Sequence, residues 1–193
     1  MKKLSSIFMI AVAACAFQAC SNASKSSTTA ADSVNAVKDT TTSGATGIGV
    51  DKDDAKFAVD AANGGMTEVE LSKLAQQKAT NAKVKDFAAM MVMDHTKAGE
   101  ELKGIAKTKN ITLPDSVSAD SKKAIADLSE KSGADFDKAY VNQMVDDHKK
   151  TVSMFEDGAK NLKDADLNTF ATKTLPTLKE HLTKINSIHE SIK

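Results

Sequence analysis

Val84 to Ile105 reads VKDFAAMMVMDHTKAGEELKGI, with apolar residues recurring at steps of three and four. This spacing places them on one face of an α-helix. The apolar face includes Phe87, Met91 and Leu102, and it continues through one polar residue, His95. Ala, Met, Lys, Glu and Leu, which make up most of the stretch, also favour helix. We therefore predict an amphipathic helix with a histidine on its buried face.

Three further segments repeat this pattern, so that four long helices are predicted. Asn81 and Asp164 are good N-cap residues and leave only short turns, which makes each pair of helices an antiparallel hairpin. The expected helices cover about Asp53–Ala79, Ala82–Lys109, Ala134–Leu162 and Ala165–Ile192.

The two hairpins are joined by Asn110 to Gly133, which contains Pro114 and a predicted short helix at about Asp120–Lys131. This segment is long enough to run the length of the bundle. We therefore predict an all-α, ferritin-like four-helix bundle with a long crossover that contains a short helix. A plain up-down bundle is the alternative topology.

Residues 1–19 are typical of a lipoprotein signal peptide. A basic start precedes an apolar run from Ile7 to Phe17 that is too short to cross a bilayer as a helix. The run leads into Ala-Phe-Gln-Ala-Cys20, which resembles a lipobox with Phe17 at the position where Leu is commonest. We expect cleavage before Cys20 and lipidation of its thiol; an ordinary secretory signal cut nearby is the alternative. The lipid would anchor an exported periplasmic or cell-envelope protein to a membrane, with the outer membrane the expected one.

The segment after Cys20 has the composition of a linker. Ser21 to Gly49 is rich in Ser, Thr, Ala, Asn and Gly and contains no aromatic residue. Such a segment buries too little apolar surface to offset the entropy of ordering it. We therefore predict that residues 20–50 form the lipidated cysteine and a flexible tether, and that residues 51–193 form the bundle.

Charge and cysteine content exclude several classes of function. The chain has 26 basic residues, all Lys, and 26 acidic residues. No guanidinium group is present for recognition of phosphate, and no basic cluster contains interleaved aromatic residues, so nucleic-acid binding is not expected. The only cysteines are Cys15 and Cys20. The bundle therefore has no disulfide and no thiolate metal site.

Each apolar face contains one polar residue at a core position. Glu68 and His95 are equally far from the turn at Asn81, and His148 and His181 are equally far from the turn at Asp164. Residues equidistant from a hairpin turn lie at the same height. All four side chains are therefore expected to meet at one depth inside the bundle.

Two explanations fit such a buried polar group, because buried polar atoms need partners. Three imidazoles and one carboxylate would suit one transition-metal ion, which could be Zn, Fe, Cu or Mn. Asp94, Asp147 and Glu180 directly precede the histidines and could orient them or act as further ligands. The alternative is a metal-free hydrogen-bonded network that sets the helix register. Gly64-Gly65 in the first long helix suggests either a close helix approach or a kink.

Several motifs resemble a bacterial domain-of-unknown-function family, number 4142. They lie at Phe57–Leu71, Val84–His95, Ile111–Pro114, Phe136–His148 and Thr174–Leu182. The resemblance implies a ferritin-like bundle that is usually exported, and it brings no established activity. The family-motif positions include Glu68, Glu70, Asp94, His95, Asp147, His148, Glu180 and His181, without a settled role.

The ferritin-like comparison also bears on catalysis. Di-iron proteins of that fold usually carry Glu-x-x-His, whereas Val92, Val145 and Leu178 stand three residues before the histidines. Our first expectation is therefore a non-enzymatic, lipid-anchored envelope protein with a binding or stress-related role. A metal-binding bundle for storage, buffering or sensing is the second, and a metalloenzyme is the third.

Overall fold

The computed structural model describes residues 26–40 and 50–192, and every regular element in these ranges is a helix. The all-α prediction is confirmed, and the four long helices begin and end within one residue of their predicted bounds. Within the described ranges no helix has both the length and the apolar character needed to cross a bilayer. The helices are α1 (Ser27–Thr40), α2 (Lys52–Lys78), α3 (Ala82–Thr108), α4 (Ala119–Ser129), α5 (Gly133–Asn161) and α6 (Ala165–Ser191).

Side-chain caps explain where α3 and α6 begin. The Asn81 side chain accepts a hydrogen bond from the Lys83 amide at 2.9 Å. The Asp164 side chain accepts bonds from the amides of Asp166 and Leu167, both at 3.0 Å. These bonds satisfy first-turn amides that have no partner inside the helix. The structure therefore has both short turns at the positions predicted from these residues.

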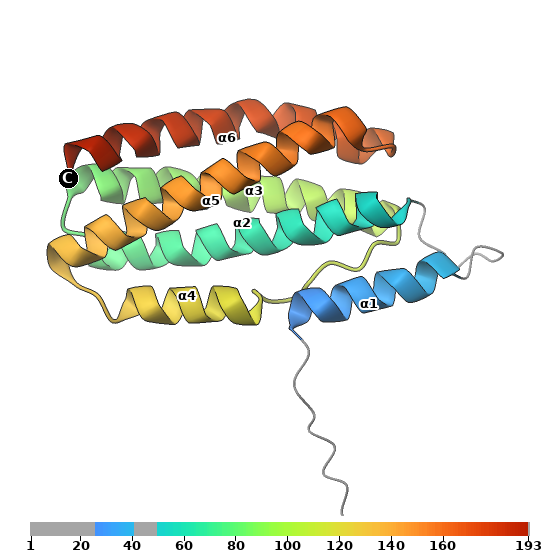
Figure 1. Cartoon of the computed structure of the whole chain (residues 1–193), viewed down its shortest axis with the longest axis horizontal. Coiled ribbons are helices and arrows are strands. Elements are labelled where there is room, and N and C mark those ends of the chain that lie inside the picture. The colour runs from blue at the N-terminus through green and yellow to red at the C-terminus, as the bar shows by residue number, and fades with distance from the viewer. Residues whose placement is uncertain (1–25, 41–49, 193) are drawn as a thin grey trace, which may run out of the picture.

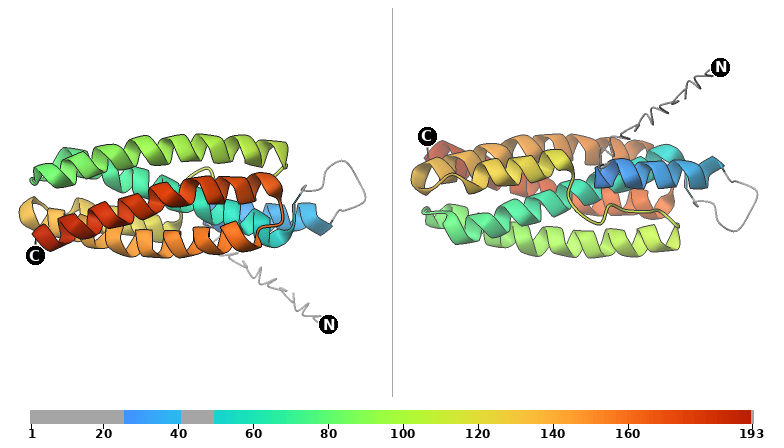
Figure 2. Two further views of the ribbon diagram at one scale, coloured as in Figure 1. Left: turned by 90° about the horizontal axis from the view of Figure 1, so that it is seen from above. Right: turned by 90° about the horizontal axis from the view of Figure 1, so that it is seen from below.

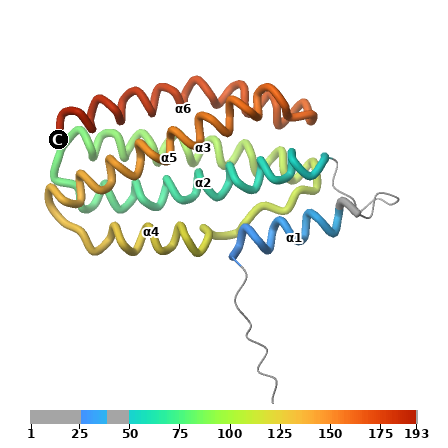
Figure 3. The backbone as a smooth tube through the Cα atoms, viewed as in Figure 1, coloured from blue at the N-terminus to red at the C-terminus, as the bar shows by residue number. Residues whose placement is uncertain are grey.

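The four long helices pack as two antiparallel hairpins, α2–α3 and α5–α6 (Figure 1). Figure 3 traces the chain between them: after α3 it doubles back along the bundle through α4 before α5 begins. As a result α3 and α5 run in the same direction, as in a bundle with a long crossover. Contacts of α2 with α5 and of α3 with α6 close the bundle.

The apolar core is divided into two clusters along the bundle axis. One cluster contains Phe87 and Tyr140 and lies toward the α2–α3 turn. The other contains Phe155 and Leu167 and lies toward the α5–α6 turn. The polar residues of the four core faces lie between them in sequence on every long helix, and they form the layer described below.

Two buried aspartates hold the hairpin turns from the opposite hairpin. Asp137, near the start of α5, accepts hydrogen bonds from the Thr80 and Asn81 amides and from the Thr80 hydroxyl. Asp54, near the start of α2, accepts bonds from the Lys163 and Asp164 amides. Neither aspartate stands out in the sequence, because acidic residues are common near the start of any helix.

Helix α1 contradicts the prediction of a flexible tether for residues 27–40. It packs against α2, and Figure 2 shows it next to α4 on the same side of the bundle. Its buried face consists of Ala31 and Asn35. The side chain of Asn35 donates from Nδ2 to the Thr112 carbonyl oxygen at 3.0 Å and accepts at Oδ1 from the Thr112 backbone amide at 2.8 Å. This contact buries one small side chain and one hydrogen-bonded amide, and so it requires little apolar surface. The polar composition of the segment therefore did not predict that it packs on the bundle. The predicted signal peptide and Cys20 lie outside the described residues.

Candidate metal centre

A layer of four buried polar side chains crosses the middle of the bundle. Each long helix contributes one: Glu68 is 2% exposed, His95 8%, His148 0% and His181 1%. The centroids of the three imidazole rings lie 5.4 to 5.8 Å apart. The structure therefore brings together the residues that their distances from the two turns had placed at one depth.

The three histidines form a group with the geometry of a metal site. One ring nitrogen from each lies within 4.8 Å of the others. Nε2 of His95, Nε2 of His148 and Nδ1 of His181 are buried and have no hydrogen-bond partner within residues 26–40 and 50–192. A buried polar atom left without a partner costs about 1–3 kcal/mol, so three such atoms in one layer need an explanation.

The remaining ring nitrogens have acceptors beside them. Nδ1 of His148 lies 2.9 Å from the Met144 carbonyl oxygen, and Nε2 of His181 lies 2.9 Å from Oδ2 of Asp94. A carbonyl or a carboxylate only accepts, so these nitrogens carry the proton and donate. The lone pairs of His148 and His181 are then on their unpartnered nitrogens. Metal-binding histidines use the same arrangement, in which the second nitrogen donates to an oxygen and fixes the tautomer.

Burial keeps the imidazoles neutral. Removal from water, together with the neighbouring His181 and His148, lowers the pKa of His95 to about 3. Burial likewise lowers the pKa of His148 to about 4. The pKa of His181 is also lowered by burial, although the hydrogen bond to Asp94 opposes the shift. At neutral pH the rings therefore present lone pairs to a cation without first losing a proton.

Glu68 is placed differently from the other three residues. Its Oε2 lies 3.2 Å from Nδ1 of His95 and its Oε1 lies 3.4 Å from Nδ1 of His148. Neither contact is aligned as a hydrogen bond, and both carboxyl oxygens lack a hydrogen-bond partner. Burial, with the charge of Asp147 adding to it, raises the Glu68 pKa to about 8. The carboxyl group thus faces the Nδ1 atoms of two rings whose Nε2 atoms are unpartnered, and it is outside the group of three nitrogens.

The acidic residues that precede the histidines have three different environments. Asp94 contacts His181, as described. Asp147 accepts a hydrogen bond from Gln143 at 2.8 Å and contacts none of the three rings. Glu180 points to solvent and pairs with Lys184 at 2.7 Å. A residue next to a buried one on a helix points about 100° away, so only the neighbour that faces another helix can reach the layer.

The Gly64-Gly65 pair does not mark a close helix approach. Helix α2 continues unbroken through both residues. A Cβ atom on Gly64 would meet nothing within 4 Å, and one on Gly65 would lie 3.9 Å from Nδ1 of His95. The two glycines therefore leave open space beside the histidine layer.

The three rings fit a first-row transition metal with a small closing movement. Metal–nitrogen distances of about 2.0–2.1 Å put three coplanar nitrogens about 3.5 Å apart. Nitrogens that lie within 4.8 Å of one another would close by at most about 1.3 Å. Rotation of the side chains on their helices can supply such a movement.

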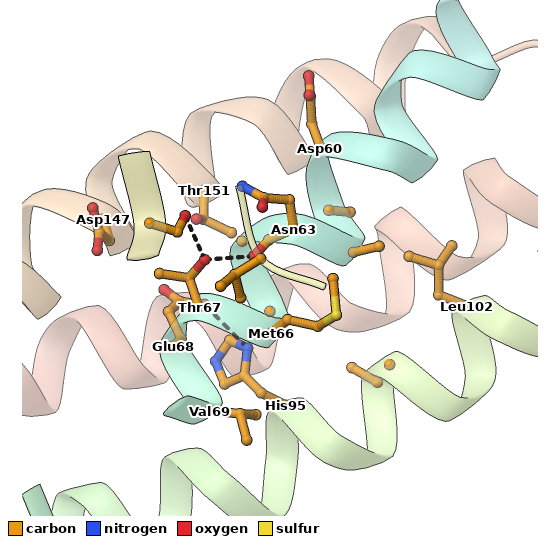
Figure 4. A pocket seen from close by; sticks show the side chains of 18 of the residues that line it. Asp60, Asn63, Met66, Thr67, Glu68, Val69, His95, Leu102, Asp147 and Thr151 are labelled. Atoms are coloured by element: carbon orange, nitrogen blue, oxygen red, sulfur yellow. Dashed lines mark hydrogen bonds and ion pairs between the residues drawn. The ribbon is translucent and has the colours of Figure 1, made fainter. Parts of the chain in front are cut away.

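A cavity of about 1080 Å³ adjoins the layer, and Glu68, His95 and His181 are part of its lining. Figure 4 shows Glu68 and His95 side by side in this lining, joined by a dashed line, with Met66 near His95. The cavity is also lined by the connection between α3 and α4, at Leu113 and Pro114.

Solved structures with the same fold are known. A DUF305 fragment from Deinococcus radiodurans has a TM-score of 0.66 at 10% identity, covering 74% of this chain and 98% of that one. CopM in its Cu(I)-bound form has a TM-score of 0.61 at 15% identity, covering 72% and 96%. A DUF305 protein from Streptomyces coelicolor has a TM-score of 0.61 at 14% identity, covering 72% and 93%. At these identities the likeness shows the fold.

No curated protein matches this chain. A family comparison does match, over residues 38–188, which include most of the bundle and the whole histidine layer. The chain therefore belongs to the family described as "Domain of unknown function (DUF4142)".

Proposed function

We propose that this protein binds one transition-metal ion through His95, His148 and His181. The observations that carry the proposal are that one ring nitrogen from each of the three histidines lies within 4.8 Å of the others, and that each ring has one buried nitrogen without a hydrogen-bond partner among the described residues. A metal-free network, the alternative considered from the sequence, would pair these atoms with each other or with neighbouring groups. A cation instead takes all three lone pairs at once.

Asp94 and Glu68 act in this proposal as positioning residues. Asp94 orients His181 through Nε2, and the Met144 carbonyl orients His148 through Nδ1. Glu68 faces Nδ1 of His95 and of His148. The ligand set is then three neutral imidazoles, and Glu68 positions two of the rings without binding the ion.

Copper is the ion that we propose. Imidazole suits Zn, Cu, Fe and Ni, and among divalent ions Cu²⁺ binds most tightly to a given set of nitrogen ligands. CopM, which shares the fold, was solved with Cu(I) and with Cu(II). A single site of three nitrogens suits buffering or sensing of one ion, whereas storage would need many sites.

We further propose that the protein is exported and anchored through Cys20. The support is the lipobox-like sequence that ends at Cys20. One protein with the same fold, from Streptomyces coelicolor, is described as secreted. A Cys20→Ala variant should leave the membrane fraction, and its retention there would refute lipidation at this residue.

Metal titration of the purified full chain tests the binding proposal. Cu(I), supplied under anaerobic conditions, and Cu²⁺ and Zn²⁺ are each added while bound metal and thermal stability are measured. We expect one copper ion per chain, and a stabilisation of about 2.7 kcal/mol when the free ion is at 100 times its Kd.

Matched histidine variants decide whether the layer is responsible. His95→Gln and His148→Gln should lose the bound ion and the stabilisation. His189→Gln should keep both, because His189 is the one histidine of the chain outside the layer. Equal binding by all variants, or no stabilisation of the unsubstituted chain by any of the three ions, would refute the proposal.

A further inference from the structure

The cavity beside the histidine layer extends from the protein surface to the buried rings. Its lining includes the exposed residues Asp120 and Lys150 as well as the buried His95 and His181. These two histidines each carry an unpartnered ring nitrogen. A cation that enters the cavity therefore reaches side chains with free lone pairs.

The lining has an excess of negative charge. Apart from Glu68, whose raised pKa leaves it mostly protonated at neutral pH, seven of the lining residues are Asp or Glu and three are Lys, whereas the whole chain has 26 of each sign. The three lysines pair with Glu70, Glu100 and Asp147, which are themselves part of the lining. A concave surface with one sign of charge raises the local concentration of the opposite ion and speeds its association.

Glycines form the wall of the cavity next to His95. All residues from Ala61 to Met66 on α2 are partly exposed, although the helix lies within a bundle. Gly64 and Gly65 lie in this stretch and line the cavity. A Cβ on Gly65 would have ordinary van der Waals space beside His95, so a larger side chain would fill the passage without displacing the helix.

We propose that this cavity is the route by which a transition-metal cation reaches the three histidines, and that the acidic excess of its lining draws the cation in. The inference rests on the proposed metal site and adds how that site is loaded. The route passes the side of α2 at Gly64 and Gly65, next to Glu68 and His95. It predicts that bulk at Gly65 changes the rates of loading and release, but not the affinity.

Rapid mixing of the full chain with Cu²⁺ tests this inference. Uptake is followed by the absorbance of the bound ion, and release is followed after addition of excess EDTA. In Gly65→Val the new side chain must move aside for each passage, which should slow uptake and release by about tenfold or more. The Kd should stay within about twofold, since both rates fall together. Gly104→Val, on an exposed stretch of α3 outside the cavity, places the same side chain in a helix and should leave both rates unchanged.

Charge provides a second and independent measurement. Uptake by the unsubstituted chain should slow as salt is added, because screening weakens the attraction. A double variant Asp115→Asn, Asp120→Asn, at two exposed acids of the lining, should slow uptake and leave release unchanged. If Gly65→Val does not fold, Gly65→Ala, for which there is space, should slow both rates by a smaller factor.

The outcomes separate this inference from the metal site itself. If copper binds one per chain and the Gly65 variants load and release it at the rates of the unsubstituted chain, the route is wrong and the site stands. A tenfold loss of affinity in Gly65→Ala, with normal uptake, would also overturn the route, because it would place Gly65 in the site. If the unsubstituted chain takes up no copper, both proposals fail.

Discussion

The buried Asp137 offers the sharpest stability prediction. Its side chain is 4% exposed, and it accepts bonds from the Thr80 hydroxyl at 2.6 Å, the Asn81 amide at 2.8 Å and the Thr80 amide at 3.0 Å. An amide in its place keeps one oxygen and turns an NH₂ group toward the same donors. Asp137→Asn should therefore lose one or two hydrogen bonds to a charged acceptor, which contribute about 1.5–3 kcal/mol each.

We expect Asp137→Asn to lower the free energy of unfolding by about 2–4 kcal/mol. The loss stays below the full sum of two such bonds because the freed donors of the turn can bond to water. Denaturant titration of the full chain, with the slope and the midpoint both fitted, measures this. Asp135→Asn is the matched control: Asp135 lies two residues earlier, in the first turn of α5, but is exposed, so only its interaction with the helix dipole is lost, at about 0.3–1 kcal/mol.

A cycle with Thr80→Ala identifies the bond responsible. Thr80→Ala removes the hydroxyl donor and keeps the backbone donors, so in the Asp137→Asn background it should cost less than in the unsubstituted chain. If Asp137→Asn and Asp135→Asn differ by less than about 1 kcal/mol, the reasoning that Asp137 holds the α2–α3 turn is refuted.

Two further predictions concern the histidine layer and the helix packing. Without metal, stability should fall as the pH drops below 6.5. Burial lowers the pKa of His95 to about 3 and of His148 to about 4, so the unfolded chain takes up protons that the folded chain does not. Each histidine contributes a slope of up to about 1.4 kcal/mol per pH unit. Glu68, whose pKa is raised to about 8, contributes one slope of the same size and opposite sign, so that the histidines outweigh it below pH 6.5. Equal denaturant midpoints at pH 7 and pH 5 would contradict this. Gly158→Ala should destabilise by about 1–3 kcal/mol, because its Cβ would lie 2.9 Å from Cε2 of Phe57. Gly104→Ala, with nothing within 4 Å, should stabilise by about 0.5–1 kcal/mol, and thermal melts that rank the two variants the other way would disprove this account of α2–α5 packing.

The long helices could be predicted from sequence because their signals are local. Apolar spacing on each segment, together with Asn81 and Asp164 as caps, placed every long helix within one residue of its observed bounds. Counting outward from those caps also placed Glu68 and the three histidines at one depth. This worked because an α-helix rises by a constant amount per residue, so that distance from a turn becomes height in the bundle.

Tertiary structure alone decided what depends on partners distant in the chain. Helix α1 is held on the bundle by bonds between Asn35 and the Thr112 backbone, 77 residues away, and no pattern within residues 27–40 reveals that partner. The same holds for Asp137 at the far turn, and for Glu180, which faces solvent although it adjoins a buried histidine. Which ring nitrogen stays free was likewise beyond the sequence. Rotamers and the oxygens around each ring determine it, and these arise only when the four helices pack together.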